Sequence, residues 1–255
     1  MANTRNTGVE DSFISHLIEL RSRVVKSALS VLVIFCVLYF IWPRGPAIYD
    51  FMARPMIAAL PHGTNMIATG IISPFLIPMK LTFLVSFMLA LPWVLYQAWA
   101  FIAPGLYAHE KRLIAPLVIS STLLFVFGVA FCYFFVFGNV FKVIYDYAPH
   151  AIKISPDIES YFDFVMTMCL GFGIIFEVPI VVIVLVRMGL VSIEKLKQIR
   201  AYVIVAAFAI AAVVAPPDIM SMIFMAVPIC VLYEVGLLVA PLFVRVTQAP
   251  EEKAS

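Results

Sequence analysis

Charged residues are scarce in this sequence. They make up 13% of its 255 residues, whereas 64% are hydrophobic, and the mean hydropathy is +1.05. Soluble domains are typically about one quarter charged and about half apolar, so this composition excludes an ordinary soluble protein. Little of the chain remains outside its apolar stretches, and we expect a single integral membrane domain over residues 1–255.

The sequence also lacks the motifs that carry catalysis or bind metals. It has no Walker loop, no nucleophile elbow, no HExxH and no GxGxxG. The histidines are isolated, and no CxxC pair occurs among the cysteines, which lie inside apolar runs at Cys36, Cys132, Cys169 and Cys230. We therefore predict that the protein is not an enzyme and has no metal, cofactor or nucleic-acid partner.

Long apolar runs are what the chain has in abundance. At about 1.5 Å per residue, a helix of about 20 residues crosses a hydrocarbon core of roughly 30 Å. The fold class predicted is an all-α membrane protein with six transmembrane helices, the fifth and sixth short. The fifth is about 22 Å long, so either the bilayer thins there or flanking residues snorkel. The expected spans are residues 24–42, 75–102, 113–137, 158–187, 201–215 and 219–243.

Turn and capping residues separate these runs. Ser73-Pro74 combines an N-cap with proline at the first helical position, and Ser155-Pro156-Asp157 repeats that pattern with an acid in the first turn. Between the first two spans, residues 47–60 predict a short helix near the interface. Residues 192–200 predict a short, capped and basic helix on the membrane surface.

The distribution of basic residues predicts the orientation. The N-terminal residues include Glu10 and Asp11 and do not resemble a cleaved signal peptide, so we expect the first span to be retained. Twelve of the 17 basic residues then share one side, which makes both termini cytoplasmic. The twelve are Arg5, Arg21, Arg23, Lys26, Lys111, Arg112, Arg187, Lys195, Lys197, Arg200, Arg245 and Lys253; the other five are Arg44, Arg54, Lys80, Lys142 and Lys153.

Two acidic residues, Glu19 and Glu110, lie among the bases of this predicted cytoplasmic edge. One interpretation is structural: Glu19 pairs with Arg23 or Arg112, and Glu110 is an ordinary first-turn acid. The other is a binding site, because two carboxylates on adjacent edges could each accept a guanidinium in a charge-assisted pair. Such a site would prefer arginine to lysine in a cationic peptide.

Glu177 is the acid with the least favourable position. It lies about 15 Å from the inner end of its span, where an ionisable group costs on the order of 2.5 to 3.5 kcal/mol on insertion scales. Pro179 removes a helical hydrogen bond at the same place and should loosen the helix. Glu177 therefore either faces a functional polar cavity or serves as a buried hydrogen-bond partner in packing.

Three further acids permit simpler interpretations. Asp218 follows two prolines and is either the N-cap of the sixth span or a functional intramembrane polar group. Asp163 could snorkel outward from the fourth span, and Glu234 is expected to make an interior polar contact.

Several short motifs together resemble the TatC family, the signal-peptide receptors of the twin-arginine protein translocase. The resemblance runs from about Ser15 to Gly236 and covers nearly the whole chain. The motifs are HLIELRSR before the first span, SPF and KLTF in the second, WAFIAPGLYAHEKR in the first inner loop, FEVP in the fourth span and APPD before the sixth.

The resemblance implies a cupped, glove-like bundle in the bacterial cytoplasmic (inner) membrane, with both termini inside. It also implies TatA- and TatB-like single-span partners, a multi-copy complex in contact with membrane lipids, and export of folded proteins driven by the proton-motive force. By resemblance, Glu19 and Glu110 recognise the twin arginines of the signal peptide, Arg21 and Phe101 support that site, and Glu177 lies in the membrane-embedded concavity.

One pair of residues departs from the family pattern. Some relatives carry a threonine and a glutamine as a polar patch for the single-span partners, where this chain has Ala215 and Met222. Ser221 is the nearest polar residue, and we assign no partner site on the fifth and sixth helices.

Two other functions are compatible with the residues alone. A proton-coupled small-molecule secondary transporter would use Glu177, although such carriers commonly show internal repeats, and no half-to-half similarity is evident here. A passive scaffold for other membrane proteins would need Glu177 for assembly only.

Overall fold

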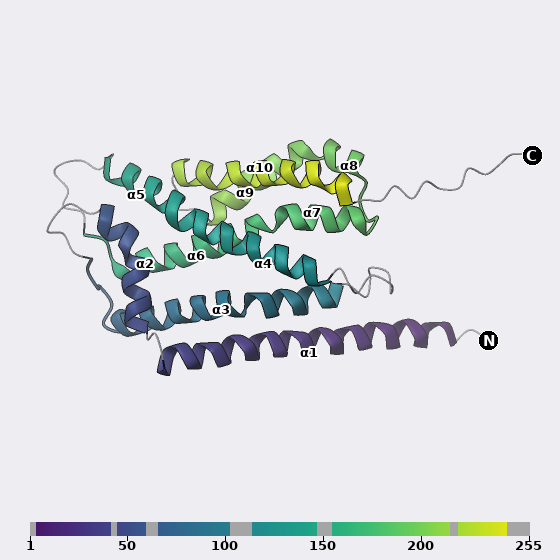
Figure 1. The fold of residues 1–255 in the computed structure, drawn as a ribbon, viewed down its shortest axis with the longest axis horizontal. Helices are drawn as coiled ribbons and strands as arrows, with labels where there is room; N and C mark the ends of the chain where they lie inside the picture. The colour runs from purple at the N-terminus through teal and green to yellow at the C-terminus, as the bar shows by residue number, and fades with distance from the viewer. Residues whose placement is uncertain are drawn as a thin grey trace, which may run out of the picture.

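The structure is a computed structural model that describes residues 4–41, 45–59, 66–102, 114–146, 155–214 and 219–243. These residues are almost entirely helical, and the one β-bridge among them joins Ile67 and Asp157. Figure 1 shows the helices in chain order: α1 (Thr4–Phe40), α2 (Gly45–Ala59), α3 (Ser73–Ile102), α4 (Ile114–Phe131), the π-helical segment η3 (Cys132–Val136), α5 (Phe137–Asp146), α6 (Ile158–Phe176), α7 (Val178–Arg187), α8 (Ile193–Gln198), α9 (Arg200–Val214) and α10 (Ile219–Phe243).

Five helical stretches of the described residues are long and apolar enough to cross a membrane: Ile14–Phe40, Ser73–Ile102, Ile114–Val143, Ile158–Arg187 and Ser221–Leu242. The apolar helix α9 is shorter, with 15 residues, as the sequence predicted. The prediction that the sixth helix is also short was wrong. Helix α10 has 25 residues, or about 37 Å, because its apolar run continues as helix through Pro228 and Pro241.

The fourth apolar stretch is divided in two at Glu177, which ends α6 and precedes α7. The N–H of Glu177 donates to the carbonyl of Ile174 at 3.0 Å, a tighter turn than an α-helix makes. Pro179 lies in the first turn of α7, where its missing N–H is tolerated. The predicted loosening of the helix at Pro179 is thus confirmed.

The caps at the start of α3 and α6 differ from those predicted. Asp157, not Ser155, is the N-cap of α6, and its carboxylate accepts from the N–H of Ser160. Ser73 instead donates its hydroxyl to Glu159 across the molecule, at 2.5 Å. The predicted cap of α8 is confirmed, since the Ser192 side chain accepts from the N–H of Lys195.

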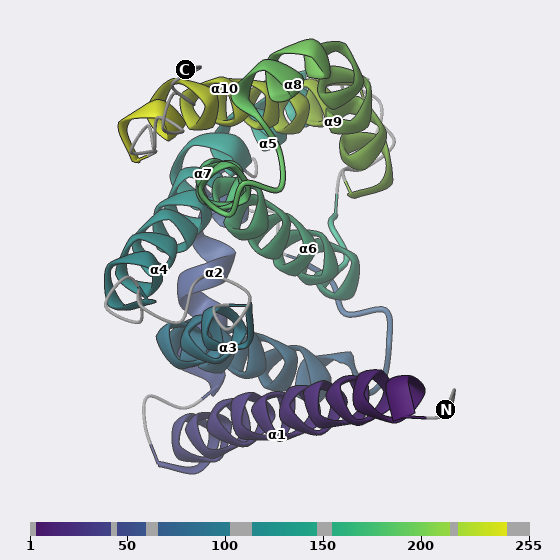
Figure 2. The same cartoon turned by 90° about the vertical axis from the view of Figure 1, so that its right-hand side faces the viewer.

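The helices form an open row and not a closed ring. Helix α1 packs chiefly against α3, which contacts α4 and α6; α7 then packs on α10, and α10 on α9 (Figure 2). The helices run roughly alongside one another, so the molecule has two ends along the helix axes. Helix α1 begins and α10 ends at one of them, which we call the termini end; α2 lies across the opposite one, the α2 end (Figure 1).

The centre of the row is the crossing of α4 and α6. Phe162, Met168 and Phe172 of α6 are fully buried, and the two backbones approach closely at Gly128. A Cβ there would lie 2.6 Å from the carbonyl oxygen of Phe172, a distance that real Cβ atoms do not reach. Glycine at position 128 therefore permits the close packing of the two central helices.

Residues 66–73 are attached to the start of α6 at the α2 end. The N–H of Ile67 donates to the Pro156 carbonyl at 2.9 Å, and the N–H of Ile158 donates back to the Ile67 carbonyl at 2.9 Å. The Asp157 carboxylate accepts from the N–H and hydroxyl of Thr69, at 3.1 and 2.7 Å. These hydrogen bonds connect segments that are 88 residues apart in the sequence.

Candidate functional site

Glu19 lies in the first half of α1 and is held by a cation of the same helix. The Nε and Nη2 atoms of Arg23 both donate to the Oε1 atom of Glu19, at 2.9 and 2.6 Å. The side chains are 37% exposed for Glu19 and 23% for Arg23. Of the two sequence interpretations, the local ion pair is therefore the one present in this structure.

Helix α3 contributes a third group to this pair. The Arg23 Nη1 atom donates to the Oε1 atom of Gln97 at 3.3 Å, and Gln97 is only 5% exposed. Arg23 thus spans the seam between α1 and α3, with its guanidinium shared by a carboxylate and a buried amide. This arrangement shows that a guanidinium fits beside Glu19.

An aromatic contact lies next to this cluster. The rings of His16 on α1 and Phe101 on α3 are stacked, with centroids 4.3 Å apart and an interplanar angle of 21°. On α1, His16 precedes Glu19 by three residues, and on α3, Phe101 follows Gln97 by four. His16 therefore lies one turn from Glu19 on the same face of α1, and Phe101 one turn from Gln97 on the same face of α3. Phe101 therefore packs against α1 at His16, one helical turn from Glu19.

The remaining members of the predicted peptide site are not assembled by the described residues. Arg21 is exposed on α1, two residues from both Glu19 and Arg23, and residues at that spacing do not face each other on a helix. Glu110 lies in 103–113, and Asp218 in 215–218, both outside the described residues. Helix α3 ends and α4 begins at the termini end (Figure 1), and Gln97, which binds Arg23, lies five residues before that end of α3.

Glu177, at the α6–α7 break, has an unusual polar environment. Both of its carboxylate oxygens are buried, and neither accepts a hydrogen bond from the residues that the structure describes. The neighbouring hydroxyl is that of Ser121 on α4, which accepts from the indole N–H of Trp99 at 3.1 Å. Polar groups of α3, α4 and α6 therefore meet midway along an otherwise apolar stretch.

The two other acids considered from the sequence are in ion pairs. Asp163 accepts from the Nζ atom of Lys80 at 2.8 Å, linking α6 to α3. Glu234 accepts from Arg200 at 2.7 Å and is 44% exposed, so the expected interior contact was wrong. Both pairs are surface features of the helices that carry them.

Sequence reasoning missed Gln97, the stacking role of His16, and the Trp99–Ser121 hydrogen bond. A signal for Gln97 existed: it is the only amide in the apolar run of α3, four residues before Phe101. Its partner on α1 could not be found without the register between the two helices.

Asp157 provides the clearest electrostatic effect outside the spans. Hydrogen bonds from Ser160 and Thr69 stabilise its carboxylate form and lower its pKa from the ordinary 3.8 to about 2. Asp157 is therefore part of the structural attachment at the α2 end and takes no part in the cluster around Glu19.

Comparisons with known proteins agree on one family. The profile described as "Sec-independent protein translocase protein (TatC)" matches residues 15–228. A protein of that name from Escherichia coli K12 is 45% identical over 96% of this chain and 94% of its own length. The Haemophilus influenzae protein of that name is 46% identical over 92% of this chain and 91% of its own.

A solved structure matches as well. The crystal structure titled "Twin Arginine Translocase Receptor- TatC" superposes with a TM-score of 0.79 at 34% identity, covering 90% of this chain and 100% of that one. The fold is therefore shared along nearly the whole length of both chains.

Proposed function

The chain belongs to the TatC family, and from this premise we propose that it binds twin-arginine signal peptides as the receptor subunit of a Sec-independent protein translocase. It is a multi-pass membrane protein of a transport system and not an enzyme. The peptide's arginines bind at the termini end, on the carboxylates of Glu19 and Glu110.

The observation that supports this site is the pairing of Glu19 with Arg23. An arginine side chain already contacts Glu19 through its Nε and Nη2 atoms, the edge of the guanidinium that forms bidentate pairs with carboxylates. The pair is partly exposed and lies within one helix, where such contacts contribute only about 0.3 to 0.5 kcal/mol. A signal-peptide arginine can therefore replace Arg23 at little energetic cost.

The other site residues have supporting parts in the proposal. Phe101 borders the arginine site, and its stacking on His16 keeps the ring at the edge of the Glu19 cluster. Arg21 supports the site from the exposed face of α1. Glu110 supplies the second carboxylate, so that each of the two arginines has its own partner.

We also propose six spans with both termini in the cytoplasm, within one domain of 255 residues. The span added to the five long ones is α9, the fifth in chain order, whose 15 residues cover about 22 Å; either the bilayer thins around it or flanking residues snorkel. The excess of Lys and Arg at the termini end supports this orientation in a bacterial inner membrane.

Glu177 is proposed to be a functional polar group within the membrane. Its carboxylate oxygens are buried beside the Ser121 hydroxyl, and an ionisable group at this depth must face protein or water. Asp218 is proposed to contribute a second intramembrane polar position at the start of α10.

The partners proposed are TatA- and TatB-like single-span proteins, twin-arginine signal peptides of folded cargo, and several copies of this chain. Transport is driven by the proton-motive force. Membership of the family supports the partners. The lack of a nucleotide-binding motif in the sequence is in keeping with the proposed driving force.

Binding of a labelled twin-arginine signal peptide to the detergent-solubilised protein tests the proposal. Glu110→Ala should raise the Kd by about 10- to 150-fold, since a hydrogen bond to a charged group contributes about 1.5 to 3 kcal/mol, and the double variant Glu19→Ala, Glu110→Ala should raise it further. A peptide with two lysines in place of the arginines should bind the unaltered protein more weakly.

Glu194→Ala is the matched control, because Glu194 is an exposed carboxylate on α8 outside the proposed site. An unchanged Kd for a folded double variant would overturn the receptor site, as would equal binding of the arginine and lysine peptides.

A further inference from the structure

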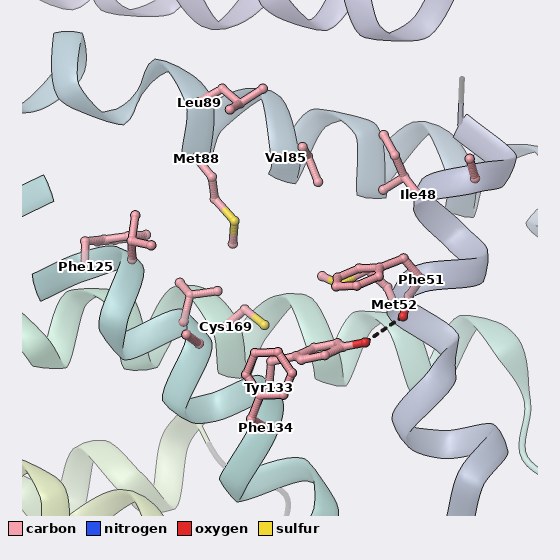
Figure 3. A pocket seen from close by; sticks show the side chains of 14 residues that line it. Ile48, Phe51, Met52, Val85, Met88, Leu89, Phe125, Tyr133, Phe134 and Cys169 are labelled. Atoms are coloured by element: carbon pink, nitrogen blue, oxygen red, sulfur yellow. Dashed lines mark hydrogen bonds between the residues drawn. The ribbon is translucent and has the colours of Figure 1, made fainter. Parts of the chain in front are cut away.

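A cavity of about 560 Å³ lies away from the peptide site, between α2, α3 and α4. Helix α6 forms its floor at Cys169 (Figure 3). The side chains that define it include Phe51 and Met52 of α2, Val85 and Met88 of α3, and Val129 and Tyr133 of the α4–η3 stretch. Its volume is within the range of small-molecule sites, roughly 300 to 1,000 Å³.

The lining residues offer no free hydroxyl to a polar ligand. Tyr133 carries the only hydroxyl among them, and this donates to the backbone carbonyl of Phe51 at 2.7 Å (Figure 3). The rings of Tyr133 and Phe51 are stacked with centroids 5.2 Å apart. The occupant that suits these walls is therefore a hydrocarbon.

A cation lies at the α2 edge of this cavity. The Arg54 guanidinium carbon is 5.5 Å from the centroid of the Phe51 ring, and the Arg54 side chain is exposed. Asp50 precedes Arg54 by one turn, yet the described residues form no ion pair with Arg54. An exposed guanidinium beside an apolar cavity can pair with the phosphate of a lipid whose acyl chain occupies that cavity.

The dimensions favour a single extended chain over a helix. The wall from Phe125 to Tyr133 covers eight residues, or about 12 Å, close to the roughly 15 Å of one leaflet's hydrocarbon. A helix of that length and about 10 Å in diameter would need ~940 Å³. The cavity can therefore enclose a single extended chain but not the full width of an apolar helix.

We propose that the cavity holds one acyl chain of a glycerophospholipid whose phosphate is bound by Arg54. The occupant enters from the leaflet on the side of α2, where the chain extends between α3 and α4 and the head group remains at the interface. The site is independent of the peptide site around Glu19.

Native mass spectrometry of the protein, purified in mild detergent and washed free of loosely bound lipid, tests the proposal. We expect one retained phospholipid. Leu89→Trp should remove it, because Leu89 lines the cavity and is exposed enough to accept a larger side chain. Arg54→Gln should lower its occupancy by about fivefold, the effect of losing one hydrogen bond to the phosphate.

Two matched controls accompany these variants. Val213→Trp adds the same bulk to an exposed position of α9, and Lys142→Gln removes an exposed cation of α5. Both should retain the lipid. A Leu89→Trp protein that melts like the unaltered one and keeps its phospholipid would overturn the proposal, as would a retained molecule that lacks phosphate.

Discussion

Two acids at the α2 end, Asp157 and Glu159, are satisfied differently from Glu19 on α1. At the α2 end, Asp157 and Glu159 accept from the neutral groups of Thr69, Ser160 and Ser73; the Thr69 and Ser73 contacts span 88 and 86 residues of sequence. At the termini end, Glu19 accepts from Arg23, which lies four residues away on the same helix. Acids of similar exposure thus have partners of different kinds.

The kind of hydrogen-bond partner separates acids with a structural role from acids whose partner a ligand could replace. A neutral hydroxyl or backbone N–H from a distant segment cannot be replaced by a ligand without detaching that segment. A local arginine can be replaced by another guanidinium with the same geometry. The partner of each carboxylate, more than its exposure, therefore indicates which acid can serve as a receptor.

The largest effect is expected from breaking the attachment at the α2 end. Asp157→Ala removes the N-cap of α6 and the acceptor of both Thr69 hydrogen bonds, and caps are a recognised source of stability. The melting temperature should fall by several degrees while signal-peptide binding stays unchanged. Thermal unfolding in detergent measures the first quantity; a melting temperature equal to that of the unaltered protein would contradict a structural role.

Acid should weaken the same attachment in the unaltered protein. The pKa of Asp157 is about 2 in the folded state, against an ordinary 3.8. Its contribution to stability is therefore complete above about pH 4 and is lost as the pH falls towards about 2. Asp157→Asn, which still caps α6 but does not titrate, should show a smaller fall over that window. Parallel curves of melting temperature against pH would refute this assignment.

At the termini end, a smaller effect of opposite sign is expected. Arg23→Ala removes the internal competitor for Glu19 and should tighten signal-peptide binding about twofold, the equivalent of an i,i+4 ion pair. Direct titration of the peptide measures the change. Weaker binding would mean that Arg23 positions Glu19 for the ligand. Arg23 would then be a structural partner of Glu19, not an exchangeable one.

The smallest effect is expected at the exposed pair of Arg200 and Glu234, whose side chains are 46% and 44% exposed. Glu234→Gln should change the free energy of unfolding by less than about 0.5 kcal/mol, as is usual for surface substitutions. Denaturant unfolding in mixed micelles checks this. A larger loss of stability would show that this exposed pair, which joins α9 to α10, is structural after all.

Much of the fold could be predicted from local pattern. Apolar length located the long helices, and Pro179 located the break after Glu177, because a missing N–H acts within one helix. The predicted local partner of Glu19, Arg23, followed from i,i+4 spacing. The sixth span was expected at residues 219–243, the bounds that α10 has, so only its description as short was wrong.

The parts that could not be predicted depend on contacts between helices. The stacking of His16 on Phe101 and the hydrogen bond to Gln97 require the register of α1 against α3, which no local pattern contains. The capping role of Asp157 was missed because Ser155-Pro156 offered an equally good local signal, and the bridge to Ile67 decided between them. Glu110 and Asp218 stay predictions, as they lie outside the described residues.

The open row has a mechanical consequence. Helix α1 is held chiefly along one seam, by α3, so a pull on its termini end is resisted mainly by that seam. At this end of the seam, Arg23 is hydrogen-bonded to Gln97 of α3 and His16 stacks on Phe101 of α3, so a force on α1 is transmitted to α3 through these contacts. Cargo bound at Glu19 would therefore pull on α1, an outer helix held along one side. The closely packed pair of α4 and α6 would stay in place.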